Sequence, residues 1–130
     1  MQLPISRGAS LIKGMNKNEF LRIWGTLPKD RETESYKPSD DDKFVRISGY
    51  LFAVQKTGNV IMKKCGYPTF SLRETFKAFR IWCKCSGIQY LRIEGSRKRY
   101  NFLSKMFPRV SIIKDLESED RNIFFVKLYD

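Results

Sequence analysis

The chain has 130 residues, of which 42% are hydrophobic, a length and composition typical of one globular domain rather than a disordered chain. Lys and Arg number 25 against 14 Asp and Glu, so the net charge is +11. Histidine is absent, which excludes Ser-His-Asp and Cys-His catalysis and most catalytic zinc sites. No stretch approaches the roughly 20 apolar residues of a membrane helix. No signal peptide is visible, so we expect an intracellular protein with no membrane partner.

The cysteines number three, and an odd count argues against a disulfide framework. Cys83 and Cys85 stand two apart, so on a helix they would point to different sides and could not hold one metal ion. We therefore expect buried or half-buried thiols, with no metal site and no cofactor.

The N-terminal third combines a short helix with a polar segment. A weak strand signal covers residues 9–13. Asn16 is followed three residues later by Glu19, the spacing of a capping box, and Gly25 stands where a helix should stop, so we predict a helix over 17–24. Residues 26–43 are acidic and contain two prolines, and we interpret them as a loop within a single domain covering 1–130.

A β-hairpin is predicted next. Residues 44–54 alternate as one strand, with one face formed by Val45, Ile47, Gly49, Leu51 and Ala53. Residues 56–59 have turn chemistry, and 60–65 are apolar enough to return as the partner strand.

The strongest helix signal covers residues 71–86. Ser71 and Glu74 form a capping box, and Gly87 lies just beyond the end. One stripe at helical spacing is the predicted core face, made of Leu72, Phe76, Phe79 and Cys83. A second stripe beside it is basic, made of Arg73, Lys77, Arg80 and Lys84.

A buried strand at 88–94, a helix over 97–107 and a second hairpin over 110–129 complete the chain. The order predicts an α+β fold with a mixed β-sheet, in which hairpins flank a strand–helix–strand–helix centre. The crossover between 60 and 94 implies at least one parallel strand pair.

Aromatic residues make up 14% of the chain, and most belong to apolar patterns. We assign four to the core: Phe76, Phe79, Phe124 and Phe125. Four tyrosines have polar neighbours and are expected to be exposed, although an ordinary core could also hold them: Tyr36, Tyr50, Tyr67 and Tyr100. Exposed rings are the faces on which nucleic-acid bases stack.

Basic charge is concentrated in the second half of the chain. Between Ile61 and Val110 there are twelve basic and two acidic residues, a net charge of +10. Arg97, Lys98 and Arg99 stand at the start of a predicted helix, where the dipole disfavours cations and backbone N–H groups attract anions. We predict that these three bind phosphates or an acidic protein surface, and that the basic stripe of 71–86 extends the patch if the two meet in space. The alternative is an ordinary solvated cationic surface.

Glu94 ends a central strand and is a candidate general base. It could equally pair with Arg92 or Arg97, and without histidine or a second converging acid the case for catalysis is weak.

From residue 44 to residue 129 the order of elements resembles the GNAT acyltransferase fold. The corresponding parts are a strand meander, a long helix, a strand, a helix and a closing hairpin. The resemblance implies an acyl-CoA loop of the form Gln/Arg-x-x-Gly-x-Gly/Ala before the long helix. Here that place holds residues 65–71 with one glycine and Pro68, which lacks an N–H donor.

In that family the later helix often carries Asn near its start and a general-acid Tyr two turns on. Here those places hold Ser96 and Phe102 or Leu103, so no catalytic residue is carried over. The chain is therefore similar to a degenerate GNAT-like module without cofactor. Small accessory proteins of tailed bacteriophages include such modules, and this resemblance implies a place in the host cytoplasm or the virion.

Three hypotheses follow. The first is a non-enzymatic basic module that contacts nucleic acid or a nucleoprotein or virion assembly. The second is a divergent GNAT acyltransferase, and the third is an inhibitor that docks on an acidic protein surface. An open cleft between parallel strands beside the start of the 71–86 helix would favour the enzyme. A cleft filled by Tyr67, Pro68 or Phe70 would favour the binding module.

Overall fold

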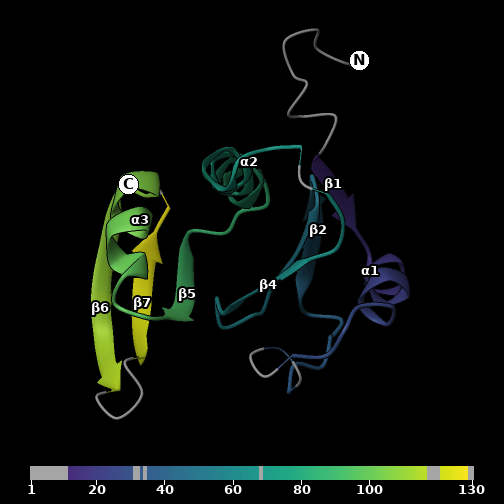
Figure 1. Ribbon diagram of the computed structural model, residues 1–130, viewed down its shortest axis with the longest axis horizontal. Helices are drawn as coiled ribbons and strands as arrows, with labels where there is room; N and C mark the ends of the chain where they lie inside the picture. Colours follow the sequence, from purple (N-terminus) through teal and green to yellow (C-terminus); the bar gives the residue numbers. More distant parts are fainter. Residues whose placement is uncertain (1–11, 31–32, 34, 68, 117–120, 129–130) are drawn as a thin grey trace, which may run out of the picture.

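The computed structural model describes residues 12–30, 33, 35–67, 69–116 and 121–128, which form three helices and seven strands (Figure 1). The expected α+β class is confirmed. In chain order the elements are β1 (Ile12–Met15), α1 (Lys17–Trp24), β2 (Lys43–Ile47), β3 (Tyr50–Val54), β4 (Val60–Lys64), α2 (Leu72–Cys85), β5 (Tyr90–Gly95), α3 (Arg99–Met106), β6 (Arg109–Leu116) and β7 (Arg121–Lys127).

The strands form two antiparallel sheets, ordered β1-β2-β3-β4 and β5-β7-β6. The expected parallel pairing of β4 with β5 is reduced, within the described residues, to an isolated bridge between Asn59 and Arg92. The Arg92 N–H donates to the Gly58 carbonyl at 2.9 Å. Gly58 has φ +91°, and a Cβ there would lie 3.2 Å from the Tyr90 carbonyl oxygen, so glycine is needed for this close approach. Beyond the bridge the two strands belong to separate sheets.

Helices α1 and α2 cover opposite faces of the first sheet (Figure 1). Phe79 of α2 stacks on Phe52 of β3, with ring centroids 4.3 Å apart, and α3 packs on the same side of the fold. Phe20 of α1 stacks on Phe44 of β2 at 4.5 Å, on the opposite face of the first sheet. The core prediction for Phe76 and Phe79 is confirmed, since both are buried in the larger cluster.

The prediction of one strand over 44–54 is wrong. The chain reverses at Ser48 and Gly49, so that Ile47 pairs with Tyr50 and β2 runs antiparallel to β3. Ser48 adopts φ +54°, a left-handed conformation suited to a tight turn. As a result Val45 and Leu51 face opposite sides of the sheet, and both sides are buried. Because both faces of β2 and β3 are buried, apolar residues continue through the segment, and the pattern by itself does not mark the turn.

Both predicted capping boxes are present. The Asn16 side chain accepts from the Glu19 N–H and the Ser71 hydroxyl from the Glu74 N–H, and each glutamate returns a bond to the N-cap backbone. Past the end of α2, Gly87 has φ +76° and Ile88 donates to the Cys83 carbonyl at 2.9 Å, a Schellman arrangement. The predicted core stripe of α2 is wrong for its first residue, because Leu72 at the helix start is 45% exposed.

The limits of three elements, two in the C-terminal half and one at the N-terminal end, differ slightly from the predicted ones. The helix predicted over 97–107 begins at Arg99, the strand predicted over 88–94 begins at Tyr90, and β1 lies at 12–15, while residues 9–11 of its predicted range lie outside the described residues. The second hairpin is confirmed as β6 and β7.

Phe124 of β7 is buried as predicted, whereas Phe125 is only partly buried and faces the other side of the sheet, so its assignment to the core is wrong. Because successive strand residues alternate in direction, neighbouring phenylalanines cannot share one core face.

The acidic segment 26–43 contains, in its described part, no helix or strand before Lys43. Tyr36 is nevertheless buried, and its ring meets Phe20 and Trp24 edge-on. Its hydroxyl donates to Asp42 at 2.5 Å. Burial, helped by Asp42, raises the pKa of Tyr36. The expectation of an exposed Tyr36 is therefore wrong, because this loop closes the α1 core.

Among the described residues, no helix has both the length and the apolar character to span a membrane. All three cysteines are free. Cys83 is buried and Cys85 exposed, so they point to different sides as expected, although Cys85 departs from the predicted burial.

Candidate nucleic-acid interface

The cluster of Arg97, Lys98 and Arg99 follows directly from the end of β5. The chain leaves the strand at Gly95 and turns, with Arg99 N–H donating to the Ser96 carbonyl and Tyr100 N–H to the Arg97 carbonyl, both at 3.0 Å. Arg97 and Lys98 therefore lie in the turn, and only Arg99 is within the helix. All three residues are exposed.

The start of α3 differs from the starts of α1 and α2. Its N-cap residue Lys98 is in the helical region, at φ −58° and ψ −30°, and no side chain among the described residues caps it. The first turn contains no acid. Three positive side chains thus surround the positive end of a helix dipole, an arrangement that an external anion would stabilise.

Arg99 is positioned by a glycine. Its side chain folds back over Gly95, so that a Cβ at Gly95 would lie 2.9 Å from the Arg99 Cδ and 3.1 Å from its Nε. Arg99 also belongs to the lining of a cleft between β4 and β5. The charge pattern of the sequence points to Arg99 but does not reveal the need for glycine at position 95.

The four basic residues of α2, namely Arg73, Lys77, Arg80 and Lys84, are exposed as predicted. Arg80 Nη1 donates to the Met106 carbonyl at 3.4 Å, where a cation is favourable at the C-terminal end of α3. Arg73 and Lys84 are eleven residues apart, which at 1.5 Å per residue separates them by about 16 Å along the helix.

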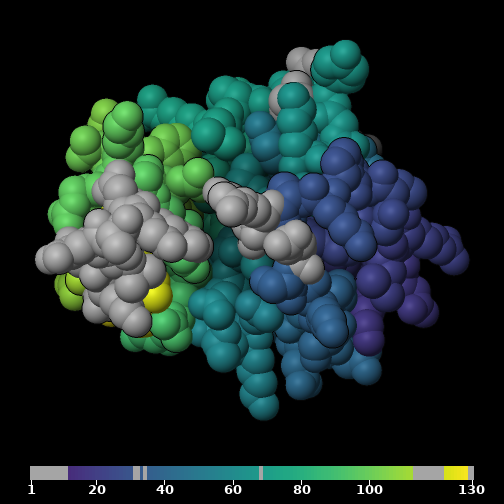
Figure 2. Space-filling model, turned by 60° about the horizontal axis from the view of Figure 1, so that its bottom comes forward, coloured from purple at the N-terminus to yellow at the C-terminus, as the bar shows by residue number. Residues whose placement is uncertain are grey.

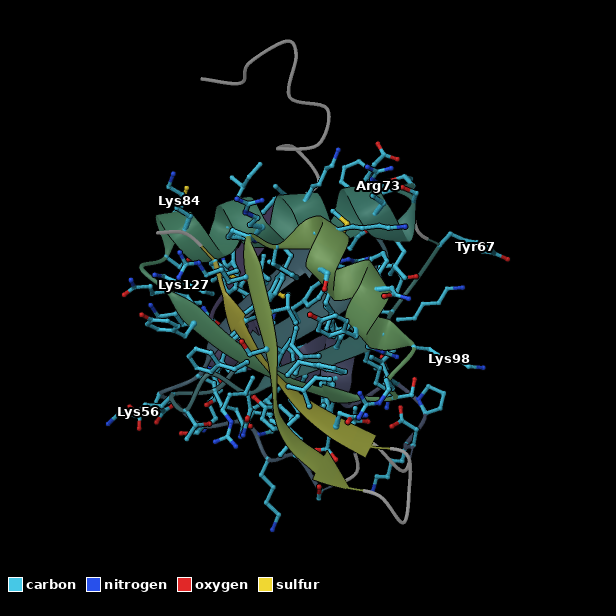
Figure 3. The ribbon with its side chains drawn as sticks, turned by 90° about the vertical axis from the view of Figure 1, so that its left-hand side faces the viewer. Lys56, Tyr67, Arg73, Lys84, Lys98 and Lys127 are labelled. Carbon is cyan, nitrogen blue, oxygen red and sulfur yellow. The ribbon has the colours of Figure 1, made fainter. Side chains whose placement is uncertain are left out.

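The stripe and the cluster do not form one compact patch. In Figure 3, Arg73 and Lys98 lie on the side of the molecule that carries α3, whereas Lys84 lies at the other end of α2, on the side of Lys127. Ring contact between Phe76 and Phe102, at 5.3 Å, brings the first half of α2 against α3. Of the seven predicted residues, Arg73 therefore lies on the same side of the molecule as the 97–99 cluster, and Lys84 lies on the opposite side.

A cleft of about 510 Å³ lies between β4 and β5. It is lined by Val60–Lys64, by Ile93–Ser96, and by Tyr50, Phe76, Arg99 and Thr33. In Figure 2 the green and yellow residues of the C-terminal sheet lie on one side of the molecule, and the blue and purple residues of the N-terminal part lie on the other. Tyr67, 95% exposed, points away from the fold and does not fill the cleft (Figure 3). Phe70 packs on the main core, and Pro68 lies outside the described residues.

The β4 wall of this cleft forms an ion pair with the acidic segment 26–43. Lys63 Nζ lies 3.4 Å from an Asp30 carboxylate oxygen and 5.1 Å from the centre of the Trp24 ring. Hydrogen bonds from Thr33 and, secondarily, the charge of Lys63 lower the pKa of Asp30. The lining of the cleft also contains two exposed cations, Lys64 and Arg99, and one exposed acid, Glu94.

The start of α2 is already occupied by the protein's own groups. Glu74 places a carboxylate oxygen 3.3 Å from the Ser71 backbone nitrogen, and its own N–H donates to the Ser71 hydroxyl at 3.1 Å. A phosphate at this helix start would meet that carboxylate, which opposes its binding.

The described residues contain no group of three or more acids and cysteines placed to hold a metal ion. Sequence reasoning missed a further set of exposed residues on the outer face of β5-β7-β6, around Tyr90. The signal was present as the period-two pattern of β5, whose odd positions Leu91 and Ile93 are buried while Tyr90 and Glu94 are exposed.

Comparison of the chain with protein-family models, with curated proteins and with solved structures found no match.

Proposed function

We propose that the protein is a non-enzymatic module that binds nucleic acid, alone or within a nucleoprotein or virion assembly. The observation that supports this most is the exposed cluster of Arg97, Lys98 and Arg99 around a helix start without a side-chain cap in the described residues. A phosphate group is the natural occupant, since it would meet both the cations and the dipole.

The distribution of charge supports the same function. Two described acids of the 30–42 segment form ion pairs at 3.4 Å, Asp40 with Lys17 of α1 and Asp30 with Lys63 of β4. The region from Ile61 to Val110 has a net charge of +10 in the sequence, and Lys63 is the member of it that Asp30 pairs with. A field this one-sided attracts polyanions and speeds their association.

The test compares two triple variants with equal loss of charge. One carries Arg97→Gln, Lys98→Gln and Arg99→Gln. The matched control carries Lys13→Gln, Arg22→Gln and Lys29→Gln, at exposed positions of the N-terminal part.

Affinity for DNA and RNA is measured at several salt concentrations from about 50 mM upward. The first variant should bind more weakly, and the slope of log affinity against log salt should fall by about 2 to 3, because each lost phosphate contact contributes roughly 0.7 to 0.9. The control should keep most of the affinity. Equal losses in both variants would show that only total charge matters. A parent that binds neither nucleic acid at ~50 mM salt would exclude this function and leave an acidic protein surface as the partner.

A GNAT-type acyltransferase is the second candidate, and the open cleft between β4 and β5 is the observation in its favour. The cleft is lined by all of β4 and by the carboxyl end of β5, next to the parallel bridge between Asn59 and Arg92. In many α/β folds ligands bind at the carboxyl ends of strands. The Glu74 carboxylate in the cap of α2 argues against this candidate, because it would repel the phosphates of acyl-CoA at that helix start. We expect no binding of acetyl-CoA in titration calorimetry, and micromolar affinity would promote the enzyme over the binding module.

A further inference from the structure

The outer face of the β5-β7-β6 sheet carries a second set of residues suited to nucleic acid. Helices α2 and α3 both pack on the inner face with Leu91, Ile93 and Phe124, and in the described ranges no helix covers the outer one. In Figure 3, Lys127 lies on the opposite side of this sheet from α3. Among the described residues of this face, Tyr90, Arg109 and Ser111 are exposed, and Arg92, Phe125 and Lys127 are partly buried.

Strand register arranges this face in rows. Lys127 of β7 pairs with Tyr90 of β5 and with Arg109 of β6, so these three side chains form one row across the sheet. The next row contains Arg92, Phe125 and Ser111. Paired residues project to the same face, and successive rows are about 6.6–6.8 Å apart.

An aromatic platform lies across these rows. The rings of Tyr90 and Phe125 are stacked, with centroids 5.0 Å apart and planes at 27°. Tyr90, the first residue of the edge strand β5, is 42% exposed, so its ring is accessible on this face. An exposed ring beside cations is the combination that holds single-stranded nucleic acid, in which bases stack on the ring and phosphates meet the charges.

A cavity of about 440 Å³ adjoins the platform, and Tyr90 belongs to its lining. Its walls include two cations, Lys43 and Lys56, and one acid, Asp41, together with the amide side chains of Gln55 and Gln89. Amides offer both donors and acceptors to the edge of a base. Lys56 lies on the same side as Lys127 in Figure 3, so the cavity extends the cationic face.

We infer that this outer sheet face, centred on Tyr90 and Phe125, binds single-stranded nucleic acid. The inference rests on the proposed function and adds a surface distinct from the 97–99 cluster. A duplex fits less well, because its base faces are covered by their neighbours and cannot stack on Tyr90. A second copy of the chain fits less well too, because like cations would meet and each copy carries a net charge of +11.

The experiment uses Tyr90→Leu, which keeps an apolar side chain and removes the ring, and Tyr90→Phe, which keeps the ring. Tyr67→Leu is the matched control, since Tyr67 is 95% exposed and lies on the other side of the molecule (Figure 3). Fluorescence anisotropy measures the affinity of each variant for one labelled single-stranded oligonucleotide and for its duplex. Tyr90→Leu should lose roughly 5- to 150-fold in single-strand affinity, the range for one base–aromatic stack, with little change for the duplex. Tyr90→Phe and Tyr67→Leu should stay near the parent.

Photo-crosslinking of the unmodified protein to the single strand provides the second measurement, and the crosslinked peptide should contain Tyr90 or Phe125. If the parent binds nucleic acid but Tyr90→Leu keeps its single-strand affinity, this inference fails and the proposed function stands. Equal losses for single strand and duplex would also overturn it, as would a dimer that Tyr90→Leu dissociates. A parent that binds neither form removes the proposed function and this inference with it.

Discussion

Replacing Phe79 with alanine tests how α2 is attached to the sheets. Phe79 is fully buried, stacks on Phe52 at 4.3 Å and lies 5.9 Å from the Trp82 ring. It also meets Phe76 edge-on at 6.1 Å. Removing the ring leaves a cavity at the centre of the larger core, because three aromatic neighbours cannot all collapse into it.

The expected loss is about 3–5 kcal/mol of unfolding free energy, the range for a buried phenylalanine cut to alanine. Domains of this size have total stabilities of about 5–15 kcal/mol, so the change removes a third or more of the stability in most of that range. Ile81→Ala is the control on the same helix. Ile81 is 60% exposed, and its replacement should stay within about 0.5 kcal/mol of the parent.

Urea unfolding followed by tryptophan fluorescence gives both values, and Trp82 reports directly on the site. Phe79→Leu keeps most of the apolar volume and should lose less than the alanine variant, which preserves a measurement if the alanine variant does not fold. An unchanged urea midpoint for Phe79→Ala, or equal effects of Phe79→Ala and Ile81→Ala, would show that the helix faces the sheet with another side.

Three further predictions concern the junction of the sheets, the cap of α2 and the thiols. Gly58→Ala should destabilise the protein by about 1–2 kcal/mol, because Gly58 has φ +91° and approaches β5 closely. The control Gly14→Ala should cost less, because the nearest neighbour of a Cβ there is 4.0 Å away. Similar urea midpoints for the two variants would show that the close approach of Gly58 to β5 does not contribute to stability. Ser71→Ala should cost about 0.5–2 kcal/mol through loss of the capping box, and no loss in thermal or urea unfolding would contradict the cap. At pH 8 an alkylating reagent should modify exposed Cys85 before Cys83, because burial raises the pKa of Cys83 to about 12 and keeps it as the thiol. Mass spectrometry of partly labelled protein would expose the opposite order.

Local sequence was sufficient for the helices. The ends of α1 and α2 follow from Asn16 with Glu19, Ser71 with Glu74, and Gly87, because capping joins residues three or four apart and needs nothing from the rest of the chain. The exposure of the α2 cations and the burial of Phe76 and Phe79 follow from the same short-range period.

Tertiary structure decided the remaining features. Residues 44–54 are apolar on both faces, so only the packing of α1 on one side and α2 on the other accounts for the pattern and for the reversal at Ser48. The burial of Tyr36 depends on Phe20, sixteen residues away, and the outward direction of Phe125 depends on its register with Arg92. The candidate surfaces have the same origin. Charge composition predicts a cationic protein, but strand pairing between distant segments determines which cations lie beside an exposed ring and which lie beside a cleft.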